Sequence, residues 1–237
     1  MNTVTSLFVK CFGTSNLNNG RGKTIFHQVE KPSTDEWLNL SSDHKKAMIK
    51  YLYGHTLGTK PLRISNKGIR TLSAEKKESP LMNYQLLRPL GEGVYGEVKL
   101  YRHKKTNKCY AVKSSDMGHL GGLTNETLVT EAVVSIAVSG LERYVRMKKV
   151  LVDKGRKKIY YLMEVLKRLS HQDVLKLAQT HKKDDTLGLP KLGIEILDRH
   201  LGNVMKRKKD DREVMVEIDY GMSEVDKRRL YRGLAGK

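Results

Sequence analysis

The sequence predicts an α+β fold built around an antiparallel sheet. Residues 84–113 contain three consecutive strand-like runs, YQLLRPL, EVKLYRH and KCYAVK, which are separated by the turn sequences GEGVYG and KKTNK. Two further hairpins are predicted, over 146–166 with a turn at 153–155 and over 203–221 with a turn at 209–212. Helical patterns are few, which favours a sheet-dominated fold over a helical bundle.

Length and cysteine usage set the broad class. The chain has 237 residues and a mass of 27.0 kDa, enough for a hydrophobic core without disulfide support. Its two cysteines, Cys11 and Cys109, exclude a disulfide framework and a multi-cysteine zinc module. We therefore expect a reducing, cytoplasm-like setting.

Residues 1–80 differ from the rest of the chain. The first 23 residues are rich in Asn, Thr, Ser and Gly, which is compatible with a type III secretion signal and delivery into a host cell. One helix is predicted near 42–53, with Ser42 as its cap and Met48, Tyr51 and Leu52 on one face. Residues 59–80 are basic and polar and predict a linker or surface strap before a domain that starts near residue 81.

Two helices are expected in the remainder. The segment 125–139 follows the third strand, and 170–182 is an amphipathic pattern with Val174, Leu175 and Leu177 on its inward side. No run approaches the roughly 18 apolar residues of a membrane span.

The charge of the chain is its most unusual bulk property. Lys and Arg number 45 against 26 Asp and Glu, a formal charge of +19, which favours anionic partners. The basic residues are scattered and lack an aromatic stacking platform, so we do not expect sequence-specific nucleic-acid binding. We expect them to form a docking surface for an acidic protein or an anionic membrane. The basic residues lie mostly in the strap at 59–80, in the hairpin at 146–158, in the turn at 206–209 and in the tail, which includes Arg228 and Arg229.

A glycine-rich segment lies between the first two strands of 84–113. Gly91-Glu92-Gly93-Val94-Tyr95-Gly96-Glu97-Val98 lets backbone N–H groups approach phosphate oxygens without obstruction by Cβ atoms. A strand follows this loop, whereas the dinucleotide-binding motif opens a helix. The third strand carries Ala111-Val112-Lys113, whose lysine can neutralise nucleotide phosphates.

Two further motifs follow in the second half of the chain. Asp198 and Asn203 form a D-x-x-x-x-N pattern, and Asp219-Tyr220-Gly221 comes after the last predicted hairpin. In phosphoryl transfer, one such aspartate can accept a hydroxyl proton while the other polar residues hold Mg²⁺.

Taken in order, these motifs make residues 84–221 resemble eukaryotic-type protein kinases. The resemblance implies a two-lobe fold: an N-lobe over 81–166 with a five-stranded antiparallel sheet and one helix, and a much reduced C-lobe over 167–237. Only 16 residues follow Gly221, which is similar to pared-down bacterial effector kinases. We expect part of residues 1–80 to pack on this small C-lobe and replace missing core.

The resemblance also assigns site residues. Asp198, Lys113 and His200 would be catalytic, with Asn203 and Asp219 as Mg²⁺ ligands. Glu131, preferred over Glu126, would pair with Lys113, and Met163 would precede a hinge at which Glu164 and Leu166 offer backbone groups to adenine. The remaining ATP-binding positions are Gly91, Gly93, Val94, Gly96, Val98 and Ala111.

Departures from the family pattern bear on function. Ile196-Leu197 replace the His-Arg that precedes the catalytic aspartate, so the arginine that reads an activation-loop phosphate is missing. We therefore expect a constitutively competent Ser/Thr protein kinase that uses MgATP. Asp198-Arg199-His200 resembles the phosphoinositide-kinase loop, so a lipid kinase is one alternative, and a pseudokinase adaptor for an acidic partner is another. Tyrosine specificity and oligomeric state stay open.

Overall fold

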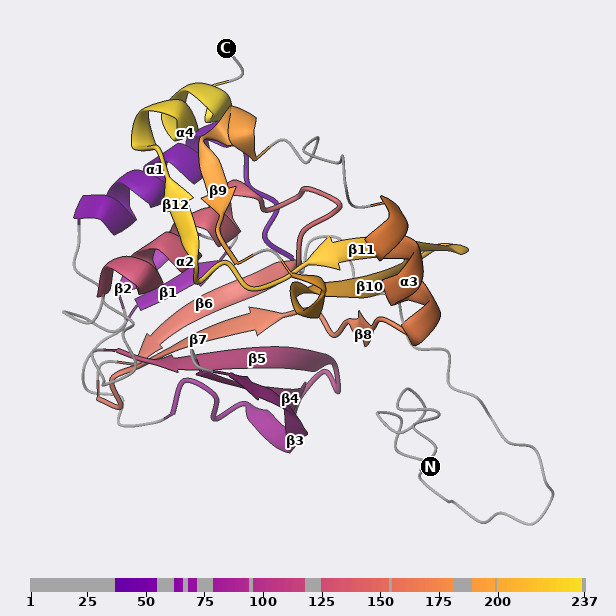
Figure 1. Ribbon diagram of the computed structural model, residues 1–237. Coiled ribbons are helices and arrows are strands. Elements are labelled where there is room, and N and C mark those ends of the chain that lie inside the picture. Colours follow the sequence, from indigo (N-terminus) through magenta and orange to yellow (C-terminus); the bar gives the residue numbers. More distant parts are fainter. Residues whose placement is uncertain are drawn as a thin grey trace. The chain divides into compact units, whose positions relative to one another are not determined.

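The computed structural model describes residues 37–54, 62–65, 68–71, 79–93, 96–117, 125–153, 155–180, 189–198 and 200–235. The expected secretion signal at the start of the chain lies outside these ranges. The fold is α+β, as predicted, with a large antiparallel sheet and few helices (Figure 1). The large sheet has seven strands in the order β2-β1-β6-β7-β5-β4-β3. Their bounds are β1 Leu62–Ser65, β2 Gly68–Thr71, β3 Tyr84–Gly93, β4 Gly96–His103, β5 Cys109–Asp116, β6 Met147–Asp153 and β7 Lys158–Met163.

The expected number of five strands in this sheet was wrong. The two extra strands, β1 and β2, come from the segment predicted to be a linker or strap. Strand β1 pairs with the outer edge of β6 and places Ile64 opposite Val150, with Ile64 fully buried. An edge strand exposes unpaired backbone groups, and this hairpin covers them. The strands are only four residues long and basic, so their pattern is too short to stand out in the sequence.

Three helices lie on one side of the large sheet (Figure 1). They are α1 Ser42–Gly54, α2 Asn125–Ala137 and α4 Lys227–Leu234, and α1 packs against both α2 and α4. Helix α1 contributes Met48, Ile49 and Leu52 to the main hydrophobic core. Part of the N-terminal region therefore packs against the C-terminal helix and shares one hydrophobic core with it, as expected. The cap of α1 is Ser41 rather than Ser42, because the Ser41 hydroxyl accepts the His44 N–H at 3.4 Å.

The second half of the chain forms two small sheets. One has the order β11-β10-β8 and the other pairs β12 with β9. Helix α3 (His171–Thr180) is joined to the first by an ion pair of 2.7 Å between Asp173 and Lys206. Leu175 was predicted to face inward but is 51% exposed, whereas Val174 and Leu177 are half-buried. The strand bounds are β8 Lys167–Arg168, β9 Ile194–Ile196, β10 Val204–Lys209, β11 Arg212–Glu217 and β12 Ser223–Val225.

The opposite face of the large sheet carries an aromatic cluster. Trp37, Tyr84, Tyr110 and Tyr160 are buried there, and the rings of Trp37 and Tyr110 meet edge to face with centroids 6.1 Å apart. A β-bulge in β6 lets the neighbouring side chains of Lys148 and Lys149 both turn toward this cluster. Their Nζ atoms lie 4.3 Å from the Tyr110 ring centroid and 4.9 Å from that of Tyr84. The sheet thus has buried side chains on both faces. Among the described helices, none has the length and apolar character needed to cross a membrane.

Lys45 joins α1 to the end of α2. Its Nζ donates to the Ala137 carbonyl at 3.0 Å and to the Ser139 carbonyl at 2.7 Å, and the side chain is buried. The last carbonyls of a helix have no partner within the helix, and a cation there also interacts favourably with the helix dipole. Burial lowers the pKa of Lys45.

We expect Lys45→Met to lower the free energy of unfolding by about 1–3 kcal/mol, because two buried carbonyls lose a charged donor. Urea unfolding at pH 7 measures the change. Lys46→Met is the matched control on the same helix, since the Lys46 ammonium makes only a long ion pair of 3.8 Å with Asp43. Equal stability of the two variants would contradict this role for Lys45.

Lys149 should make stability rise with pH. The pKa of Lys149 is lowered to about 8, mainly by burial and further by the charges of Lys148 and Arg63. Between about pH 8 and the unfolded value of 10.5, the unfolded chain binds a proton that the folded chain has lost, so the contribution of this group rises with pH. We expect Lys149→Met to remove about 1 kcal/mol of that rise, after allowance for solvent screening. Urea titrations at pH 7.5 and 10 test it, with the exposed Lys104→Met as control.

Candidate functional site

A buried lysine lies at the centre of the predicted site. The Lys113 Nζ, on β5, is 2.7 Å from Glu131 Oε1 on α2 and 2.7 Å from Asp219 Oδ1, which follows β11. Lys113 and Glu131 are each 5% exposed, whereas the Asp219 side chain is 34% exposed. Three segments that are far apart in the sequence therefore meet at one ammonium group.

The glutamate that pairs with Lys113 is Glu131, not Glu126. Glu126 is exposed and lies one turn and a half earlier on α2, where it lines a separate pocket. Burial lowers the pKa of Lys113, but the charges of Glu131 and Asp219 outweigh it, so this pKa lies above its ordinary value. Burial also raises the pKa of Glu131 against the pull of Lys113. Lys113 is thus held as a cation and faces two carboxylates.

The backbone at Asp219 is in an unusual conformation. Its φ is +62°, a left-handed geometry that non-glycine residues seldom adopt and that Asp tolerates better than most. The following residue, Tyr220, is 2% exposed, and its hydroxyl donates to the Glu217 carbonyl at 3.0 Å and accepts the Val145 N–H at 3.2 Å. The buried ring therefore anchors the turn, and the turn holds the Asp219 carboxylate toward Lys113.

The D-x-x-x-x-N segment forms a compact turn around η4 (Leu201–Asn203). The Asn203 amide nitrogen donates to the Asp198 carbonyl at 2.9 Å, which leaves the amide oxygen of Asn203 as a candidate ligand. The His200 Nδ1 accepts the Gly202 N–H at 3.0 Å, so the proton of the neutral ring is on Nε2, 3.5 Å from Asp198 Oδ1. Asp198 and His200 are about half exposed.

The glycine-rich segment forms the tip of the β3–β4 hairpin. Gly93 pairs with Gly96, and Val98 on β4 pairs with Lys113 on β5. Gly96 has a φ of +132°, and a Cβ there would overlap the Ser114 carbonyl oxygen, so the fold itself requires this glycine. A Cβ at Gly93 would meet none of the described atoms within 4 Å. Ala111 pairs with Met163 across β5 and β7, and Val94 lies outside the described residues.

The predicted hinge is held by a buried ion pair that sequence reasoning missed. The Glu164 carboxylate binds the Arg207 guanidinium through both oxygens, with Arg207 Nε 2.7 Å from Oε2, and it also accepts the Arg146 N–H at 2.7 Å. Arg207 donates further to the carbonyls of Glu142 and Tyr144 at 2.6 and 2.8 Å. The Glu164 N–H donates to the Arg146 carbonyl at 3.0 Å. Leu166, which follows, is half-buried against the main core.

This finding corrects the interpretation of residues 206–209 as part of a docking surface. Arg207 is 6% exposed and satisfied internally. Lys206 bridges Asp173 and Glu213 at 2.7 and 2.8 Å, and Lys209 pairs with Glu142 at 2.6 Å. Lys208 is the exposed member of the four. A cluster of cations in the sequence does not reveal which carboxylates the fold brings to it.

The donors expected for Mg²⁺ come from both ends of the β10–β11 hairpin. Asn203 immediately precedes β10, and Asp219 follows β11 by two residues. The described residues contain no cluster of three or more His, Cys, Asp or Glu side chains suited to a metal ion. Mg²⁺ is commonly held by one or two carboxylates together with substrate phosphates, and Asp219 with Asn203 fits that smaller donor set.

Comparison with known proteins adds no family assignment: no protein-family model matches the chain, and a search of the curated proteins gives no match. Any functional argument therefore depends on the site itself.

We expect Arg207→Met to lower the free energy of unfolding by about 3–5 kcal/mol, because the Glu164 carboxylate would be left buried without its cation. Adding Glu164→Gln should recover part of the loss, which a double-mutant cycle by urea unfolding would reveal. The exposed Lys208→Met is the control. Independent, additive effects of the two substitutions would show that the pair is not coupled.

Proposed function

We propose that this protein is an ATP-dependent phosphotransferase, specifically a Ser/Thr protein kinase with a kinase-like arrangement of two lobes and a small second lobe. The single observation that carries the proposal is the Lys113 ammonium held between Glu131 and Asp219. In the kinases that residues 84–221 resemble, the corresponding lysine and glutamate form an ion pair, and the corresponding aspartate binds Mg²⁺. Chance motifs in an unrelated fold would not be expected to converge on one atom.

The hairpin above the lysine supports nucleotide binding. Gly91 and Gly93 are exposed, and packing does not require a glycine at Gly93. Open backbone there is what close approach of phosphate oxygens needs. Arg168, which follows the predicted hinge, donates to the Leu90 carbonyl at 2.9 Å and so joins β8 to the strand that leads into this loop.

The chemistry follows from the positions of the polar groups. Lys113 would neutralise the α- and β-phosphates. Asp198 would take the proton of the substrate hydroxyl as its oxygen bonds to the γ-phosphorus, while the bond to the β–γ bridging oxygen breaks and ADP leaves. The Nε2–H of His200 would be available to the transferring phosphoryl oxygens. Mg²⁺, held by Asn203 and Asp219, would offset the negative charge of the phosphates.

Regulation would be minimal. The Lys113–Glu131 ion pair is already formed, and Ile196 and Leu197 occupy the places of the phosphate-reading His-Arg pair. Leu197 instead makes a ladder hydrogen bond from its N–H to the Met222 carbonyl at 2.8 Å. The proposal is therefore a kinase that is competent without activation-loop phosphorylation.

The test uses Asp198→Asn, which keeps size and shape at a half-exposed position. We expect the variant to lose at least about 100-fold in phosphate transfer from labelled ATP to a protein or peptide substrate, with an unchanged Tm. Lys113→Met should abolish transfer as well, and Lys99→Met on β4 serves as the control lysine. Transfer by Asp198→Asn at the wild-type rate would refute the proposal.

The same assay separates the alternatives. Wild-type protein is offered Ser/Thr peptides, Tyr peptides and phosphoinositide vesicles with the same labelled ATP. Label in the peptides supports a protein kinase, and label in the vesicles alone would replace it with a lipid kinase. No transfer to any acceptor, with ATP binding retained, would indicate a pseudokinase.

A further inference from the structure

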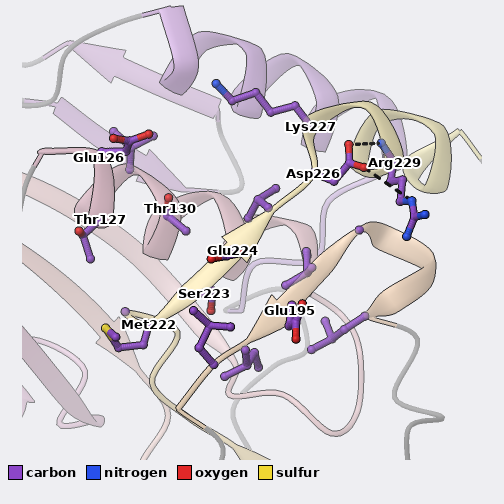
Figure 2. A pocket seen from close by; sticks show the side chains of 18 of the residues that line it. Glu126, Thr127, Thr130, Glu195, Met222, Ser223, Glu224, Asp226, Lys227 and Arg229 are labelled. Atoms are coloured by element: carbon purple, nitrogen blue, oxygen red, sulfur yellow. Dashed lines mark hydrogen bonds and ion pairs between the residues drawn. The ribbon is translucent and has the colours of Figure 1, made fainter.

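A pocket of about 1230 Å³ lies beside the Lys113 cluster, between the β9–β12 ladder and the helices (Figure 2). Its walls come from the end of α1, the first turns of α2, both strands of the ladder and the start of α4. None of the described residues of the glycine-rich hairpin lines this pocket, so a nucleotide bound under that hairpin would leave the pocket open.

The pocket reaches the proposed catalytic residues. Gly221 lines it, and a Cβ on Gly221 would lie 3.3 Å from Asp219 Oδ1 and 4.0 Å from Lys113 Nζ. Leu197, the neighbour of Asp198, lines it as well. The pocket thus adjoins the residue that follows Tyr220 and the residue that precedes Asp198, while Asp198 itself is not among its lining residues.

The mouth of the pocket is partly apolar. Leu197 and Met222 are 51% and 38% exposed, and their backbones are hydrogen-bonded to each other across the ladder. Large exposed apolar side chains next to a pocket are typical of a surface that a partner covers.

Three glutamates give the pocket a negative charge that contrasts with the +19 of the chain. They are Glu126, Glu195 and Glu224, all exposed (Figure 2). None of them forms an ion pair with another residue of the described ranges. The two cations on the same wall are engaged: Arg229 with Asp226 at 3.6 Å, and Lys227 over the Tyr53 ring at 4.1 Å.

Two of these glutamates oppose each other directly. Glu195 on β9 and Glu224 on β12 are Cα partners in the antiparallel register. Like charges in directly opposite positions destabilise a ladder, and this arrangement persists in a chain with 45 basic residues. Glu126 lines the same pocket near Tyr53, and its charge contributes, after burial and Tyr231, to raising the pKa of Tyr53 to about 12.

We propose that this pocket binds the segment of a protein substrate that flanks the phosphoacceptor, and that it selects segments carrying Lys or Arg together with an apolar residue. The inference rests on the proposed function, of which it specifies the substrate class. Glu195 and Glu224 bind the basic side chains, Glu126 extends the acidic wall, and Leu197 with Met222 contacts the apolar one. These glutamates attract a basic segment although the formal charge of the chain is +19, and the pocket directs the segment to Asp198.

The test compares wild-type protein with Glu195→Gln/Glu224→Gln. The substrates are Ser-centred peptides with Arg, Ala or Glu at the flanking positions and one Leu. We expect wild-type protein to prefer the Arg peptide, and the variant to raise KM for that peptide about tenfold with kcat and the KM for ATP unchanged. The Ala peptide should be unaffected. Because the substitution removes a like-charge pair, the Tm should be equal or higher.

Asp116→Asn/Asp211→Asn is the matched control, since it removes two negative charges from exposed positions outside the pocket. It should leave the Arg preference intact and so separate the pocket from the net charge of the protein. A preference that survives in Glu195→Gln/Glu224→Gln, or is lost equally in the control, would overturn the proposal.

A binding measurement makes the inference independent of turnover. A fluorescein-labelled Arg peptide with Ala at the acceptor position is titrated without ATP, and anisotropy gives its Kd for each protein. Binding that weakens about tenfold in Glu195→Gln/Glu224→Gln alone supports the pocket even if no transfer is found, in which case the kinase proposal fails by itself. Transfer without any preference for Arg peptides, and equal binding by all three proteins, would leave the kinase and refute the pocket.

Discussion

The position of the Lys113 ammonium constrains the rest of the structure. Strand β5 supplies the lysine, α2 supplies Glu131, and the turn after β11 supplies Asp219, so all three segments must be in register for the charges to meet. One buried cation faces two carboxylates. Burial is the main reason why the pKa of Glu131 is raised, with a smaller contribution from the charge of Asp219, and both act against the pull of Lys113. A buried ion group of this kind is weak evidence for stability, because desolvation offsets the attraction. Under the proposed function, the ammonium is held here because phosphate oxygens need a cation.

A second buried ion pair supports this arrangement. Arg207 on β10 holds Glu164 at the end of β7, and the same β10–β11 hairpin leads into Asn203 at one end and Asp219 at the other. The residues proposed as hinge and as Mg²⁺ ligands are therefore joined through this hairpin and one guanidinium group, which also donates to the carbonyls of Glu142 and Tyr144. Lys45 has the same function at the other end of the molecule, where it joins α1 to the last carbonyls of α2. In each case a long basic side chain joins segments that are far apart in the sequence.

The excess of basic residues thus has several meanings. Lys45, Lys113 and Arg207 are buried: Lys45 and Arg207 join segments of the fold, and Lys113 lies at the centre of the proposed site. Lys206 and Lys209 are paired with carboxylates. The pocket at β9 and β12 differs from the chain as a whole, whose formal charge is +19, because three exposed glutamates line it. Under the proposal, a partner with both basic and apolar side chains would be selected there by charge as well as by shape.

The sequence alone predicted the three strands of 84–113, the helices near 125–139 and 170–182 and the two later hairpins, because hydrophobic alternation, the GEGVYG turn and the Asp-Lys-Gly turn are local signals. It also identified Lys113, Asp198, Asn203 and Asp219 as candidates through the spacing of motifs. It missed the short strands β8, β9 and β12 and the C-terminal helix α4. It could not determine that β1 and β2 extend the sheet to seven strands, because short basic strands are recognisable only beside the open edge of β6. Nor could it show that Arg207 is buried, that Leu175 is exposed or that Glu195 opposes Glu224. These three findings depend on which parts of the chain meet in the fold. Pairing between segments that are far apart in the sequence leaves no signal in the residues next to each of them.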